Sequence, residues 1–221
     1  MIWSIRRIRI QGASLLAASL LLACNHEARK PSGKAVITPN APKVLDIALD
    51  AGPNALKKRL EALEAQLNDP GKRLILLAET GDLASDTPGK VLLVPDAQHW
   101  PDDTLTSFVI APDTSGHPEV LQIVPQSESG DWSEMESFLF DQKGRVRFWR
   151  HEFSWFGEGE VVSRYQVQCA WDAFGVPISR TADGRKPTNH QLATSPAGLT
   201  VHDLFAHYRL DAKLAQSGVN F

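Results

Sequence analysis

The stretch SFLFDQKGRVRFWRHEFSWF, residues 137–156, decides the fold of this 221-residue chain. Two runs rich in aromatic residues flank Asp141-Gln142-Lys143-Gly144, and Asp followed three residues later by Gly is typical of a tight turn between antiparallel strands. The phrase is repeated in its aromatic, Asp and Gly positions by Trp171-Asp172-x-x-Gly175, although turn chemistry alone also favours these residues. The two phrases predict an antiparallel β-meander over residues 136–180.

Shorter apolar runs precede this meander and are bounded by Gly and Pro. They are expected to form strands at residues 73–78, 91–94, 105–111 and 120–124. Before them, four leucines at spacings of four, three and four share one face of a helix that begins near Pro53; they are Leu56, Leu60, Leu63 and Leu67.

A second helix is expected after the meander. Thr200 with Asp203 three residues later resembles a capping box, and an apolar stripe follows it to a helix end near Gly218. The whole pattern predicts an α+β domain, in which an antiparallel β-meander sheet of six to eight strands has one helix before it and one after it.

The N-terminus has the three parts of an export signal. Three arginines lie in the first nine residues, an apolar run covers residues 13–23, and the small residue Ala23 ends it. This run is shorter than the roughly 20 residues that a membrane-spanning helix needs. Cys24 follows directly, so Leu21-Leu22-Ala23-Cys24 resembles the lipobox of bacterial lipoproteins; the alternative is an ordinary signal peptide with a chance cysteine.

The lipobox resemblance implies an anchor and an address. In lipoproteins the cysteine sulfur receives a diacylglycerol and its amine is acylated, and two or more chains hold a protein stably on a membrane. Residues 1–23 would be the signal peptide, residues 24–42 a lipidated flexible tether rich in Pro, and residues 43–221 a single domain. Asn25 rather than Asp follows Cys24, which by resemblance favours the outer membrane, facing the periplasm.

The charge of the chain bears on its partners. The first 23 residues carry three arginines and no acid, so the rest has 20 basic and 26 acidic residues, a net charge of −6. This acidity argues against nucleic acid as a partner and against electrostatic docking to anionic lipid, which leaves the lipid anchor as the membrane attachment. A protein or cell-wall partner is compatible with it.

One strand carries the most distinctive set of candidate site residues. Alternate positions place a cation, a histidine and three aromatic residues on one face, where they could bind a sugar, a peptide or an apolar ligand; they are Arg147, Trp149, His151, Phe153 and Trp155. The alternative is that this face belongs to the core, because aromatic strand residues usually pack.

Other patterns predict no catalytic residue, metal site or cofactor. His151-Glu152 begins like a zinc-protease motif, but Trp155 occupies the place of the second histidine, and neighbours on a strand point to opposite faces. The acids at residues 102–103, 128–136 and 158–160 are expected on a solvated surface. Cys169, left alone if Cys24 is lipidated, is expected to be a buried apolar residue.

The sequence therefore predicts a location more sharply than an activity. The mature part resembles small bacterial lipoproteins of unknown function that carry an FDxxGxV-type hairpin, over residues 136–180. A non-enzymatic binding or structural module of the envelope is the first expectation. An immunity or inhibitor lipoprotein that blocks a toxin is the second, and a hydrolase acting on cell-wall or lipid material through His151 or a surface acid is the third.

Replacing the lipobox cysteine tests the anchor. We expect metabolic labelling with a fatty-acid analogue to modify the wild-type protein and to be lost in Cys24→Ser, because serine offers no thiol for the diacylglycerol. The measurement is in-gel fluorescence of the labelled chain. Labelling that persists in Cys24→Ser would rule out the lipobox interpretation.

Overall fold

The computed structural model describes residues 51–216 except 68, 70, 82–88, 128, 158–159 and 188–195, and for 157 and 160–162 the backbone only. All of these residues belong to one compact unit, Val44–Phe221. The expected signal peptide (1–23), Cys24 and the expected tether (24–42) lie outside the described residues.

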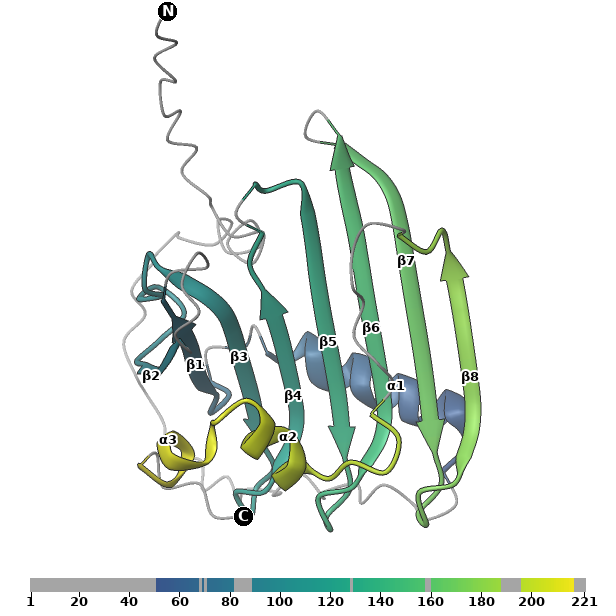
Figure 1. The fold of residues 1–221 in the computed structure, drawn as a ribbon. Coiled ribbons are helices and arrows are strands. Elements are labelled where there is room, and N and C mark those ends of the chain that lie inside the picture. Colours follow the sequence, from purple (N-terminus) through teal and green to yellow (C-terminus); the bar gives the residue numbers. More distant parts are fainter. Residues whose placement is uncertain are drawn as a thin grey trace, which may run out of the picture. The chain divides into compact units, whose positions relative to one another are not determined.

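One antiparallel sheet of eight strands forms the body of the domain, in the order β2-β1-β3-β4-β5-β6-β7-β8 (Figure 1). From β3 to β8 each strand pairs with the next, which confirms the expected meander and its strand number. The strands are β1 (Ile75–Thr80), β2 (Lys90–Val94), β3 (Thr104–Pro112), β4 (Pro118–Pro125), β5 (Trp132–Phe140), β6 (Val146–Gly157), β7 (Glu160–Trp171) and β8 (Pro177–Gly184).

Three hairpin turns at one end of the sheet share the same chemistry. They join β3 to β4, β5 to β6 and β7 to β8, and each begins with an aspartate, at Asp113, Asp141 and Asp172. Each carboxylate accepts hydrogen bonds from the backbone N–H groups two and four residues later, at 2.8 to 3.1 Å. The Asp–Gly repeat of the sequence therefore has three copies, because the loop at 112–118 is a turn of the same kind.

Helix α1 (Pro53–Ala65) packs on one straight row of apolar residues that crosses five strands. The row consists of directly paired neighbours, Ala111, Val120, Leu139, Phe148 and Ala170. Leu56, Leu60 and Leu63 of α1 are buried against it, as the leucine spacing predicts. The row lies two residues from each aspartate turn, so α1 crosses the sheet near its turn end (Figure 1).

Ion pairs fix the position of α1 along this row. Glu64 accepts hydrogen bonds from Arg150 of β6 at 2.6 and 2.7 Å and from Gln122 of β4 at 3.1 Å. Arg59 pairs with Glu119 at the start of β4. The next row on this face is polar from β4 to β7, with Gln122, Ser137, Arg150 and Gln168, and apolar at Val109 of β3.

Two short helices cover the opposite face of the sheet at the same end. They are α2 (Val201–His207) and α3 (Asp211–Gln216), and the expected single helix to Gly218 is wrong because Arg209 adopts a positive φ of 57° between them. The capping box is confirmed: Asp203 N–H donates to Thr200 Oγ1 at 3.3 Å, and Thr200 N–H donates to Asp203 Oδ2 at 2.7 Å.

Truncation of a leucine of α1 tests its packing on the apolar row. We expect Leu60→Ala to lower the free energy of unfolding by about 2–5 kcal/mol, because the side chain is fully buried and leaves a cavity. Glu61→Ala on the solvated side is the matched control and should change it by less than about 0.5 kcal/mol. Urea denaturation measures both, and equal effects would contradict the packing.

Candidate functional site

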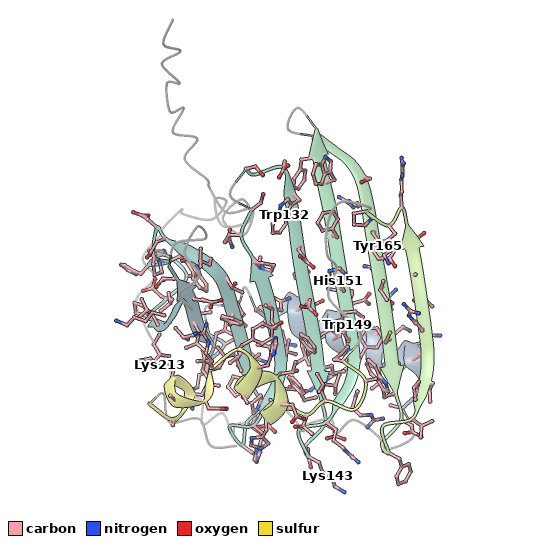
Figure 2. All side chains as sticks on the ribbon, in the orientation of Figure 1. Trp132, Lys143, Trp149, His151, Tyr165 and Lys213 are labelled. Atoms are coloured by element: carbon pink, nitrogen blue, oxygen red, sulfur yellow. The ribbon has the colours of Figure 1, made fainter. Side chains whose placement is uncertain are left out.

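The face that carries α2 and α3 also holds an unusual set of buried polar residues on β5 and β6. Cross-strand pairing places Glu136 opposite His151, and Glu134 opposite Phe153. His151 is fully buried and both acids are almost so. In Figure 2, His151 lies mid-sheet, between Trp132 near one end of the strands and Trp149 toward α2.

Each acid makes a diagonal hydrogen bond to β6. His151 Nε2 lies 2.6 Å from Glu134 Oε1, and Trp149 Nε1–H donates to Glu136 Oε2 at 2.9 Å. The rings of Trp149 and His151 stack with centroids 5.8 Å apart, so these four residues form one contiguous unit. We call Glu134, Glu136, Trp149 and His151 the acid–histidine cluster.

Burial dominates the electrostatics of the cluster. Burial raises the pKa of the Glu136 carboxyl above its ordinary value, and the Trp149 hydrogen bond and the nearby His151 only partly oppose this rise. Burial also raises the pKa of the Tyr208 hydroxyl, which follows α2, and the neighbouring Glu136 and Glu134 raise it further. Tyr208 therefore stays neutral beside the acids and joins the cluster from the helix side.

One ring nitrogen of His151 is buried without a hydrogen-bond partner, namely Nδ1. A carboxylate accepts hydrogen bonds, so in the tautomer that donates from Nε2 to Glu134 the ring leaves Nδ1 as an acceptor. Such a pair has the composition of a general base with its orienting acid. It is equally suited to accept a hydrogen bond from a bound ligand.

Aromatic residues continue from the cluster toward the end of the sheet opposite the aspartate turns. The Phe153 ring stacks on Trp132 and contacts Trp155, with centroids 6.2 and 6.4 Å apart. Tyr165 of β7 pairs with Phe153 on the same face. Trp132, Trp155 and Tyr165 are only half-buried, so we call them, with Phe153, the aromatic end.

The structure divides the row that the sequence singled out as a candidate site. Arg147, Trp149, His151 and Phe153 are buried, and Arg147 Nε–H donates to the backbone oxygen of Trp171 at 3.1 Å. Four members thus belong to the interior, in agreement with the alternative that this face is core. Trp155 alone is partly open, and with Trp132 and Tyr165 it marks where the row reaches solvent.

Two expectations about acids have opposite outcomes. The solvated surface expected for residues 128–136 is wrong for Glu134 and Glu136, which are buried in β5. The separation of His151 from Glu152 is confirmed, because Glu152 lies on the α1 side, where it accepts a hydrogen bond from Gln166 at 2.6 Å. The alternation of Trp132, Glu134, Glu136 and Phe138 is the signal that could have revealed the buried acids.

Cys169 is buried in the core, as expected. Among the described residues, no group of three His, Cys, Asp or Glu side chains could hold a metal ion. No helix within the described ranges is long and apolar enough to cross a membrane. Comparison of the chain with protein-family models, with curated proteins and with solved structures finds no match.

The raised pKa of Glu136 predicts a pH dependence of stability. The folded chain holds this proton more tightly than the unfolded chain, so above the ordinary glutamate pKa stability falls as pH rises, until the raised value is passed. Glu136→Gln removes the ionisation and keeps an oxygen for the Trp149 N–H. We expect the free energy of unfolding of this variant, measured with urea between about pH 4 and pH 8, to lack the decrease with pH that Glu136 causes in the wild type.

The wild type is the control at every pH. Parallel curves for the two proteins would contradict the burial-driven shift, since the substitution would then have removed no proton-linked contribution.

Proposed function

We propose that this chain is a lipid-anchored protein of the bacterial cell envelope, held through Cys24, whose domain binds a ligand at the aromatic end without catalysing a reaction. The lipobox resemblance and the export signal support the anchor. Asn25 supports the outer membrane, facing the periplasm.

The observation that carries the binding role is the acid–histidine cluster beneath half-buried aromatic residues. Binding sites in proteins are mostly apolar and contain a few converging polar groups, often with shifted pKa values. Trp132, Trp155 and Tyr165 supply the apolar part, and Glu134 with His151 supplies the polar part. Buried charged groups are weak contributors to stability, which supports a role beyond folding.

The ligand that matches this arrangement has two parts. One is a flat or apolar portion that stacks on the indole rings of Trp132 and Trp155, which are contributed by neighbouring strands. The other is a hydrogen-bond donor or a positive charge directed toward the carboxylates of Glu134 and Glu136. Aromatic faces also attract cations, so both parts favour a ligand without negative charge.

A hydrolase is the second candidate, favoured by the contact of His151 with Glu134. A general base activates a nucleophile by accepting its hydrogen bond. His151 Nδ1 has no hydrogen-bond partner in the structure, so it could accept one from a nucleophile. Turnover of p-nitrophenyl butyrate by the wild type, lost in a folded Glu134→Gln variant, would replace the binding proposal with this one.

A fluorescent apolar probe tests the aromatic end. We expect N-phenyl-1-naphthylamine to bind the wild-type protein saturably. Trp155→Ala should raise the Kd for the probe by roughly three- to tenfold, because the ring contact is lost. Trp100→Ala is the matched control, because Trp100 is a half-buried tryptophan that packs against β1, β2 and β3. Fluorescence titration measures the three proteins.

The control decides the interpretation. Equal weakening by both substitutions, or a wild type that does not bind the probe, would contradict a ligand site at the aromatic end. Circular dichroism of each variant establishes that the fold is kept.

A further inference from the structure

The β7–β8 turn and the start of β8 expose three apolar side chains at alternate positions. Phe174 is 87% exposed, Val176 is 56% exposed and Ile178 is 41% exposed. Single exposed apolar residues are common on protein surfaces, whereas larger apolar patches are typical of interaction sites, so three such residues close together in one hairpin are notable. We call these three residues the hairpin tip.

The two equivalent hairpins show that the turn itself does not require these residues. All three turns have the same aspartate, the same hydrogen bonds and a glycine with positive φ, at Gly116, Gly144 and Gly175. The positions that correspond to the hairpin tip are polar in the other two hairpins: Ser115, His117 and Glu119 in one, and Lys143, Arg145 and Arg147 in the other. The apolar group is therefore particular to the β7–β8 hairpin.

The described chain begins near the β7–β8 edge of the sheet, where the hairpin tip also lies. The chain leaving α1 packs through Leu67 and Leu74 against β1, β2 and β3, so α1 runs from the β7–β8 side toward that edge. Ala51, before α1, packs against the apolar row two residues from the turns. Cys24 lies 27 residues before Ala51, a separation of at most about 95 Å.

The charges around the hairpin tip are compatible with a lipid surface. The Asp172 carboxylate is occupied by the backbone N–H groups of Phe174 and Val176 at 2.8 Å. Lys143, on the neighbouring turn, is exposed and projects from the same end of the sheet (Figure 2), where an ammonium can approach lipid phosphates. Amphipathic helices bind membrane interfaces through the same combination of apolar side chains and flanking basic residues.

We propose that the hairpin tip inserts into the lipid surface to which Cys24 attaches the chain, so that the domain is held at two points. This inference rests on the proposed lipid anchor. Because the net charge of the chain after residue 23 is negative, apolar contact rather than electrostatic attraction supplies the second hold. Burial of a phenylalanine side chain strengthens membrane binding by roughly 10- to 100-fold.

A tryptophan at the tip reports on insertion. The lipidated full-length product is reconstituted in vesicles of phosphatidylethanolamine and phosphatidylglycerol in equal amounts, with or without brominated acyl chains. In Phe174→Trp we expect the added emission, relative to wild type, to be blue-shifted and quenched by bromine. Leu93→Trp is the matched control on the other edge strand, 39% exposed, and its added emission should be unquenched.

Vesicle flotation separates the two proposals. A wild type that neither floats with vesicles nor carries a fatty-acid label removes the anchor. The insertion is contradicted if the protein floats but bromine quenches the added emission of Phe174→Trp no more than that of Leu93→Trp, and aqueous iodide quenches it. The hairpin tip would then be a contact site for a protein partner. Flotation with selective quenching of Trp at position 174 supports both proposals.

Discussion

The register of the β5–β6 hairpin is the constraint on which the rest of the domain depends. Because successive side chains on a strand point to opposite faces, a slip of one residue would move Glu134 and Glu136 to the face that α1 covers. The same slip would break the apolar row, since Leu139 would leave it while Phe148 remained. The Asp141 turn therefore sets the docking of α1 and the assembly of the acid–histidine cluster together.

The acid–histidine cluster is costly to keep inside the sheet. Removing ionisable groups from water costs several kcal/mol per charge, and hydrogen bonds from His151 and Trp149 offset only part of it. The raised pKa of Glu136 agrees with this, because the effect of burial outweighs the hydrogen bond from Trp149. Apolar residues would pack here without that cost, as they do in the neighbouring row that contains Phe138. A ligand that supplies a donor to the cluster, as proposed for the aromatic end, would account for the presence of the acids.

Much of the fold could be predicted because local patterns specify it. Periodic leucines placed α1, and the Asp–Gly phrases placed two of the three hairpins. The break between α2 and α3 could not be predicted, since it depends on the positive φ of Arg209. The candidate site could be predicted only in part. The alternation along β6 indicates an aromatic face, but Glu134 and Glu136 resemble ordinary surface acids unless their alternation with Trp132 and Phe138 along β5 is considered.

The two proposed surfaces lie at opposite ends of the sheet, and this relates them. Trp155 lies nine residues beyond the start of β6 at Val146, which at about 3.3 Å per residue places it roughly 30 Å from the turn end of the sheet. With the hairpin tip in the lipid, the aromatic end would point away from the membrane. A tether alone would let the domain turn freely, whereas a second hold on the bilayer would keep the ligand-binding end directed toward the surrounding compartment. The hairpin tip would then act on ligand capture through orientation, without contact with the ligand.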